Sequence, residues 1–474
     1  MNTIWLDVTT IIGWHRPAVG VIRTEAECAS HALELAAQGK SVKFCVFDFI
    51  DGYREVRGEE VQSALDRVFG ARGVSSPVSP TVSPPPTVVA KQPLENRLKG
   101  YLLKASHKVP VRFRAHIFQF LQRRKSSFFD AIAGARLLRA AFKAFVNPEL
   151  SRQMFNVAPL RAGVSVKKNP PFNRGDTYIS LGLDWDKKDL SYLFSIKRES
   201  GFKVVLFCYD VIPVKLPHLC VGDVASKFAN YFTNASWCAD KIICISECSK
   251  RDLAALLFEL GAPMPNMEVV KLGCHVDQTS EAIISAEVAS IASKPFILFV
   301  STIERRKNHE TLYRAYTKLI DKGVKDLPLL VFVGMPGWGV SDFMLDLKLD
   351  PRTQKSIVLL NNVTDAELVT LYGGCWISAF PSLYEGWGLP VAESLAFGKY
   401  CIASDAASIP EVGGELLNYI DPWNVSAWAD EIEFLLENPE VLRAKEKNIR
   451  DHYKAVSWKD TAAAVFNAAD FDSV

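Results

Sequence analysis

The sequence predicts an α/β protein made of two doubly wound domains that face a cleft. Short, continuous apolar strands alternate with helical segments in two separate series, and this alternation is typical of parallel sheets covered on both faces. A chain of 474 residues is also too long for one ordinary core. Hydrophobic residues make up 49% and charged residues 23%, as in globular proteins.

The first series opens with a strand in "TIWLDVT" (3–9), a loop over 11–20 and a helix from Val21 that Gly39 can end. A second strand is expected in 41–50. The alternation resumes near Asp176, with helices expected over Lys187–Glu199 and Glu247–Leu257. The remaining strands of this series are expected in 176–183, 202–210 and 240–246.

The second series begins with "PFILFVST" (295–302) and continues to "KYCIAS" (399–404), with further strands expected in 327–334, 355–362 and 375–382. We therefore predict a first domain over 1–275 and a second over 276–457. A last helix, 458–474, is left unassigned by this pattern. In open parallel sheets, ligands bind beyond the carboxyl ends of the strands, so the chemistry is expected in the loops that follow them.

The segment 74–150 interrupts the first domain. Six prolines fall between Val74 and Pro93, which predicts an extended linker. Residues 91–143 then hold thirteen Lys or Arg against Glu95 and Asp130 only, with apolar residues spaced for two short amphipathic helices. We expect this basic segment to dock on an anionic membrane surface. The alternative is a solvated insertion whose aromatic residues pack on the first domain; nothing else in the chain, whose net charge is +2, favours nucleic acid.

Targeting signals are not recognisable in the sequence. The start, "MNTIWLDVTT", lacks the pattern of a signal peptide, and no stretch offers the roughly 20 apolar residues of a spanning helix. A cytoplasmic protein, peripheral on the inner face of the plasma membrane, is expected. The ten cysteines show no metal-ligand spacing, so we expect buried, reduced thiols and no metal.

The stretch "FPSLYEGWGLPVAESLAFGK" (380–399) predicts a binding loop followed by a helix over Leu389–Phe397. Gly386 and Gly388 permit close approach of a ligand to the backbone, and the new helix offers free N–H groups to an anion. Glu385 and Glu393 can then flank one ligand, such as a sugar nucleotide with hydroxyls at both ends. The alternative is a helix cap with a surface glutamate.

A basic segment, "ERRKNHETL" (304–312), follows the first strand of the second series. Arg305, Arg306 and Lys307 precede a helix that is expected to begin near Asn308. Cationic side chains beside free backbone N–H groups would suit a diphosphate. By itself, the same pattern also describes a solvated basic turn.

These motifs resemble glycosyltransferase family 4, whose members are retaining enzymes of the GT-B fold. Glu385 to Glu393 matches the family's E-x7-E motif, and 304–312 looks like its donor-phosphate segment. The resemblance covers 160–474 well, 1–50 loosely and 74–150 not at all. Further similar blocks, some of them common in bacterial polysaccharide mannosyltransferases, are "YDVIPVKLPH", "ADKIICISECSKRDL", "VVKLGCHVD", "VFVGMPGWG" and "SIPEVGGELLNYIDPWN".

The resemblance implies a hexosyltransferase that uses a nucleotide-sugar donor, GDP-mannose as a first expectation, and a lipid-linked or polysaccharide acceptor, with no cofactor and no metal. Glu385 is implied near the transferred sugar and Glu393 near the ribose. Asp210 matches the Asp of a frequent His-Asp pair, but Tyr209 replaces the His. The final helix should cross back onto the first domain. The other implied donor-binding residues are Arg306, Lys307, Gly386, Trp387, Gly388, Leu389 and Gly20.

Three alternatives remain at this point. Asp184 and Asp186 form an Asp-x-Asp pair that could bind a metal in a metal-dependent glycosyltransferase, although a helix-start cap pair is the favoured interpretation. The chain could be a non-catalytic GT-B scaffold in a polysaccharide-assembly complex. A nucleotide-sugar epimerase of the same fold is the third.

Overall fold

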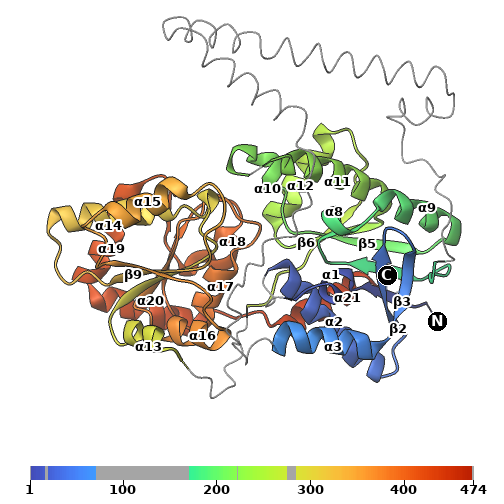
Figure 1. Cartoon of the computed structure of the whole chain (residues 1–474), viewed down its shortest axis with the longest axis horizontal. Coiled ribbons are helices and arrows are strands. Elements are labelled where there is room, and N and C mark those ends of the chain that lie inside the picture. The colour runs from blue at the N-terminus through green and yellow to red at the C-terminus, as the bar shows by residue number, and fades with distance from the viewer. Residues whose placement is uncertain (1, 16–19, 71–169, 221, 275–283, 472–474) are drawn as a thin grey trace, which may run out of the picture. The chain divides into compact units, whose positions relative to one another are not determined.

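The computed structural model describes residues 2–15, 20–70, 170–220, 222–274 and 284–471. In these residues the chain forms two sheets, each with helices packed against it (Figure 1). The basic segment 91–143, the linker 74–93 and the predicted domain boundary at 275/276 lie outside the described residues. The predicted α/β fold of two doubly wound domains is confirmed.

The first sheet has seven strands in the order β3-β2-β1-β4-β5-β6-β7, all parallel except the β2–β3 hairpin. The five predicted strands are confirmed, whereas β3 and β7 had no strong apolar signal. At the hairpin turn, Asp48 accepts hydrogen bonds from the backbone N–H of Ile50 and Asp51. The strands are β1 (Ile4–Asp7), β2 (Val42–Asp48), β3 (Gly52–Val56), β4 (Thr177–Ser180), β5 (Lys203–Cys208), β6 (Lys241–Cys244) and β7 (Asn266–Val269).

Successive side chains of this sheet enter two different cores, as the two-residue period of a strand requires. Leu6 and Ile179 join the core under α2, whereas Trp5 and Tyr178 join the core under α9 and α11. Figure 1 shows α2 and α3 on one side of the sheet and α9 and α11 on the other. The helices are α1 (Thr9–Ile12), α2 (Val21–Ala37), α3 (Gly58–Gly70), α8 (Asp184–Lys187), α9 (Leu190–Ser200), α10 (Ile212–Lys215), α11 (Val224–Cys238) and α12 (Glu247–Glu259), with a short 3-10 helix η1 (Pro217–Leu219).

The single helix expected over Lys187–Glu199 is wrong at its start. The chain forms the short α8, breaks, and then begins α9 at Leu190. The side chain of Asp189 accepts hydrogen bonds from the N–H groups of Ser191 and Tyr192, both at 3.0 Å. These contacts satisfy two donors of the first turn of α9, so the helix is capped at Asp189.

The second sheet has six parallel strands in the order β10-β9-β8-β11-β12-β13. All five predicted strands are confirmed, and only the two-residue β13 was missed. The strands are β8 (Phe296–Val300), β9 (Leu329–Val333), β10 (Ile357–Leu360), β11 (Ile377–Phe380), β12 (Cys401–Ser404) and β13 (Tyr419–Ile420). The helices are α13 (Ala286–Ala292), α14 (His309–Lys322), α15 (Ser341–Leu349), α16 (Asp365–Gly374), α17 (Leu389–Ala396), α18 (Ile409–Gly413), α19 (Val425–Glu437) and α20 (Pro439–His452), with 3-10 turns η2 (Arg305–Lys307) and η3 (Gly414–Leu416).

The last helix, α21 (Trp458–Ala468), packs on α2 of the first sheet rather than on the second sheet. The guanidinium of Arg23 in α2 lies 5.7 Å from the ring centroid of Trp458, and Thr461 donates to the carbonyl of Lys271 at 2.9 Å. Gly273 allows this approach, because a Cβ there would lie 2.5 Å from the backbone nitrogen of Trp458. Closure of the first domain by this helix therefore depends on a residue without a side chain.

All ten cysteines fall within the described residues, and each is a free thiol. Nine are buried, and Cys220 is half-buried. The expected burial is therefore confirmed for nine of the ten cysteines.

Each sheet has a position where the strand order reverses direction, and the loops after the two central strands then diverge. In the first sheet this position lies between β1 and β4, and in the second between β8 and β11. The loops that follow β8 and β11 are the two segments singled out by the sequence. The fold therefore predicts that the basic segment and the glutamate loop meet.

Candidate active site

Glu385 lies at the centre of a buried ion cluster where the loops after β8 and β11 meet. Its Oε1 accepts hydrogen bonds from Lys307 Nζ at 2.6 Å and from Ser382 Oγ at 2.5 Å. Its Oε2 is 2.8 Å from Arg306 Nη1. Because the Glu385 carboxylate is bound on both oxygens, it is neither a helix cap nor a surface glutamate, and only 8% of the residue is exposed.

The charges of this cluster stabilise one another. Burial opposes ionisation of Glu385, but Arg306 and Lys307 outweigh it and lower the pKa of Glu385 to about 2. Burial also opposes the charge of Arg306, yet Glu385 and Glu304 raise its pKa above the ordinary value. Burial and the neighbouring Arg306 lower the pKa of Lys307. Glu385 is therefore a fixed anion.

The side chains of the three consecutive basic residues contact two different parts of the structure. Arg306 and Lys307 face Glu385, whereas Arg305 donates from Nε to the carbonyl of Gly339 at 3.0 Å. All three residues lie in the tight η2 turn, and Asn308 follows it in the left-handed conformation at φ 60°. α14 begins directly afterwards, at His309, as expected.

The loop between Glu385 and α17 has the expected form. Gly388, at φ 122°, adopts a backbone conformation that favours glycine, and Pro390 stands in the first turn of α17. Gly386 is equally constrained, because a Cβ there would lie 2.3 Å from the carbonyl oxygen of Tyr209. Leu389 is the first residue of the helix.

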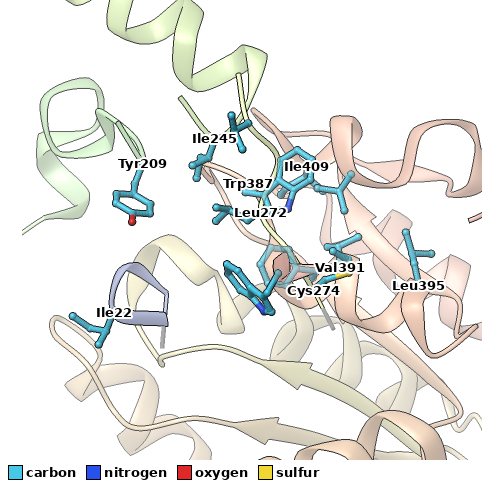
Figure 2. Packing of buried hydrophobic residues seen from close by; sticks show 14 of the residues in the cluster. Ile22, Tyr209, Ile245, Leu272, Cys274, Trp387, Val391, Leu395 and Ile409 are labelled. Atoms are coloured by element: carbon cyan, nitrogen blue, oxygen red, sulfur yellow. The ribbon is translucent and has the colours of Figure 1, made fainter. Parts of the chain in front are cut away.

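Trp387 is buried between the two sheets, beside Ile245 and Ile409 (Figure 2). Its indole N–H has no hydrogen-bond partner within the described residues. A buried N–H without a partner is costly, by about 1–3 kcal/mol. The Trp387 side chain packs in the buried apolar cluster. The backbone of 386–389 remains the part of this loop that is suited to bind a ligand.

Glu393 lies one turn into α17 and has partners of its own. Its Oε2 accepts a hydrogen bond from the hydroxyl of Tyr372, in α16, at 2.8 Å. Burial raises the pKa of Glu393 to about 7, although Tyr372 and the more distant Arg23 oppose this rise. The two glutamates of the motif therefore differ: Glu385 is a fixed anion, whereas Glu393 can exchange a proton near neutral pH.

Asp210 approaches the ion cluster from the first sheet, at the end of β5. Its Cβ is 3.2 Å from the position of a Cβ built on Gly386. Burial raises the pKa of Asp210, and the field of Arg306 opposes the rise. Tyr209 points away and donates from its hydroxyl to the carbonyl of Leu181 at 2.7 Å. Tyr209 thus fills the core of the first sheet and does not present a functional group in place of a histidine.

Gly20 forms the N-terminal boundary of α2 at φ 51° and ψ −119°, and it is exposed. Its carbonyl accepts from Thr24 N at 3.1 Å and from Thr24 Oγ1 at 3.2 Å. The helix start therefore lies at the loop after β1, on the switch-point side of the first sheet. Residues 16–19, which precede it, lie outside the described residues.

The interpretation of Asp184 and Asp186 as a cap pair is wrong. Leu183 precedes α8, and neither aspartate caps it. Asp184 is buried, accepts from Ser180 Oγ at 2.7 Å and pairs with Lys188 at 3.9 Å. Asp186 is at the surface, 3.8 Å from Lys227. Each carboxylate thus has its own partner.

The described residues contain no group of three or more His, Cys, Asp or Glu placed to hold a metal ion. Among the same residues, no helix is both long enough and apolar enough to cross a membrane.

Sequence reasoning missed the residues that support the cluster. Glu304 pairs with Arg306 Nη2 at 2.8 Å, and Ser382 donates to Glu385. Asn308 donates to the carbonyls of Pro381 and Pro422 at 3.1 and 2.8 Å, which fixes the loop after β11. These residues flank the recognised motifs in the sequence. The sequence shows that these residues are polar, but it does not show which groups they bind.

The family model described as "Glycosyl transferases group 1" matches residues 281–452. The "Serotype-specific mannosyltransferase WbdA" of Escherichia coli is 26% identical over 278 residues, which are 57% of this chain and 34% of that protein. The "O-antigen chain mannosyltransferase B" of Escherichia coli is 27% identical over 235 residues, 48% of this chain and 60% of that protein.

One solved structure matches nearly the whole chain. It is a sucrose-phosphate synthase from Thermosynechococcus elongatus, with a TM-score of 0.53 and 16% identity, covering 99% of this chain and 98% of that one. This likeness shows the fold. The chain spans about a third of the length of the WbdA relative.

The raised pKa of Glu393 predicts a pH-dependent effect of Glu393→Gln on stability. The folded-state pKa of Glu393, about 7, lies above its ordinary value of 4.5. The proton therefore favours the folded state, and wild-type stability falls as pH rises from 4.5 through 7. Relative to wild type, Glu393→Gln should gain roughly 1–3 kcal/mol across this window, measured by urea unfolding at several pH values.

A second variant checks the cause of that shift. Tyr372→Phe removes the hydrogen bond that lowers the pKa of Glu393, so its loss of stability with rising pH should begin at the same pH as in wild type but continue to higher pH. If the stability of Glu393→Gln and of wild type changed in parallel between pH 4.5 and 8, the assignment of a titrating Glu393 would be wrong.

Proposed function

We propose that the chain is a retaining hexosyltransferase, because residues 281–452 match the family model described as "Glycosyl transferases group 1". It moves a hexose from a nucleotide sugar to a lipid-linked or polysaccharide acceptor in the synthesis of bacterial cell-surface polysaccharide. The observation that carries this proposal is the buried Glu385 cluster with Arg306 and Lys307 at the switch point of the second sheet. Mannose from GDP-mannose is the first expectation, supported by the names of the relatives.

In the proposed reaction, the bond between the anomeric carbon and the diphosphate oxygen breaks, and a bond from the acceptor hydroxyl oxygen to the same carbon forms. The acceptor's proton passes to the leaving diphosphate. Attack on the same face as departure retains the anomeric configuration. A double displacement would need a carboxylate beneath the anomeric carbon, and Glu385 is already bound by two cations and Ser382.

Arg306 and Lys307 are proposed to stabilise the departing diphosphate. Lys307 has three N–H donors and uses one on Glu385, so the others remain for phosphate oxygens. The arriving anion would raise the lowered pKa of Lys307 and hold its charge. Cations fixed by Glu385 before the donor arrives need little reorganisation as charge develops.

Glu393 and the backbone of Gly386, Trp387, Gly388 and Leu389 are proposed to hold the rest of the donor. An ionised Glu393 can accept hydrogen bonds from the ribose hydroxyls. Asp210 would orient the acceptor hydroxyl from the first sheet, and Gly20 would bring the start of α2 toward the same place.

The competing functions make different use of these residues. A non-catalytic scaffold has no need of a buried carboxylate held between two partly buried cations, so the cluster favours an enzyme. A metal-dependent enzyme based on Asp184 and Asp186 is disfavoured because Asp184 is engaged by Ser180 and Lys188. The sequence-based epimerase alternative would convert the donor in the absence of any acceptor.

Glu385→Gln should reduce transfer by roughly 30- to 1000-fold, because it removes about 2–4 kcal/mol of transition-state stabilisation. Release of nucleoside diphosphate in a screen of donors, GDP-mannose first, measures this. Glu393→Gln should also reduce transfer strongly. Exposed Glu415 provides the control, since Glu415→Gln should retain full activity. Near wild-type turnover in both site variants would remove the assignment.

Excess chelator should leave transfer largely intact, because Arg306 and Lys307 supply the positive charge that a metal ion would otherwise provide. The measurement is the same release assay with and without chelator. Full loss on chelation, restored by manganese or magnesium, would favour metal-dependent chemistry instead. Alanine at Arg306 or Lys307 should weaken donor binding in either case.

Residues 91–143 are proposed to hold the protein on an anionic membrane, where lipid-linked acceptors would be found. Each basic residue near such a surface contributes about 1 kcal/mol. Liposome sedimentation should show binding to anionic but not neutral vesicles, weakened by high salt and lost in a variant without 91–143. Equal binding to both kinds of vesicle, or unchanged binding after the deletion, would favour packing of this segment on the protein.

A further inference from the structure

Two segments of the second domain contact helix α12 of the first domain. Neither contact belongs to the ion cluster around Glu385. The first contact is made by Glu411, at the start of α18. Its Oε2 accepts from Glu247 N and its Oε1 accepts from Cys248 N, both at 2.8 Å. The second is made by Tyr384, whose hydroxyl donates to Asp252 Oδ2 at 2.5 Å.

Two different residues accept hydrogen bonds from the backbone N–H groups at the start of α12. Ser246 accepts from Ser249 N at 2.9 Å, which is an ordinary cap within the same helix. The N–H groups of Glu247 and Cys248 have no acceptor within the helix, as is general for a first turn. Glu411 supplies both acceptors, and its negative charge is favourable at a helix N-terminus. One carboxylate of the second domain therefore completes a helix of the first.

Tyr384 is fixed at both its side chain and its backbone. Its hydroxyl binds Asp252, which also pairs with Lys215 Nζ at 2.6 Å. Lys215 Nζ in turn lies 4.9 Å from the centroid of the Tyr384 ring. On the backbone, the Tyr384 carbonyl accepts from Arg306 Nη1 at 2.7 Å. The next residue in the chain is Glu385, so a shift of Tyr384 would move the carboxylate.

A third contact joins the same elements. Ser249 Oγ, which is buried, lies 3.0 Å from the carbonyl oxygen of Tyr209 and 3.1 Å from that of Gly386. This hydroxyl links the loop after β5, which carries Asp210, to the loop after β11, which carries Glu385. The first two turns of α12 thus hold both loops that the proposed reaction uses.

We propose that Asp252 and Glu411 form a clasp between the two domains and that Asp252, acting through Tyr384, is a positioning residue for Glu385. The proposal rests on the proposed function for its kinetic consequence only. When the clasp is formed, the loop that carries Glu385 is held in the position that transfer requires. When the clasp is open, nucleotide can still bind the second domain, but Glu385 is no longer held in a fixed position relative to Asp210.

The first test is hydrogen exchange at single-residue resolution on the full chain, which needs no substrate. The amides of Glu247 and Cys248 should be protected in wild type and should exchange at least tenfold faster in Glu411→Ala. Glu415→Ala removes a nearby exposed glutamate and should leave both amides protected. Unprotected amides in wild type, or unchanged protection in Glu411→Ala, would overturn the clasp.

The second test addresses positioning. Leu383 N donates to the Arg306 carbonyl at 2.8 Å within the Glu385 loop. Its amide should exchange at least fivefold faster in Tyr384→Phe and Asp252→Ala. Tyr419→Phe is a matched control, because that hydroxyl binds Gly414 within the second domain. An unchanged Leu383 amide in both variants would refute the positioning role.

The kinetic arm separates positioning from binding. With a donor that supports turnover, Tyr384→Phe should lower kcat about tenfold while the Kd for GDP, measured by calorimetry, stays within twofold. Asp252→Asn, which can still accept from Tyr384, should retain more activity than Asp252→Ala. Equal loss of kcat and GDP affinity would contradict the proposal. If wild type transfers no sugar from any donor, the proposed function fails, and the two exchange tests still decide the clasp.

Discussion

The arrangement of the second domain depends on one interaction, the ion cluster in which Arg306 and Lys307 bind Glu385. A buried carboxylate without partners would be strongly disfavoured, and a buried pair of cations equally so. Parallel strands β8 and β11 are neighbours at the switch point, so their loops deliver opposite charges to the same place. The topology thus makes burial of these charges possible.

The same cluster would suit an anionic ligand because its cations are already held in place. Glu304 and Glu385 hold the guanidinium of Arg306, and the pKa of Lys307 is lowered by burial and by Arg306. In the proposed reaction, a diphosphate arriving at Lys307 would relieve that pressure on its charge. The carboxylates orient the cations, and the phosphate would complete the proposed site.

The first sheet has a buried charged group at its own switch point, with a different outcome. Lys188 pairs with Asp7 at the end of β1 and with Asp184 after β4, and all three side chains are 1–2% exposed. Burial opposes the charge of Lys188, but Asp7 and Asp184 raise its pKa. Glu25 accepts from the N–H of Ile11, which ties α2 to the short α1. These buried groups are paired with one another. Their contacts fix the loop after β1, and no charge among them is left over for a ligand.

The sequence by itself determined the two sheets, most of their strands, and the glutamates and cations of the second domain. Apolar strands and glycine loops are local signals, and the loops that follow them can be found without coordinates. The tertiary structure decided which charges meet. Arg305 and Arg306 are adjacent in sequence but face different partners, and Asp184 is a buried ion-pair residue rather than a cap. Tyr384 and Asp252 come from segments far apart in the chain, and only the tertiary packing of α12 places them together. A pairing that joins distant segments leaves no periodicity in the sequence, which is why local patterns could not reveal it.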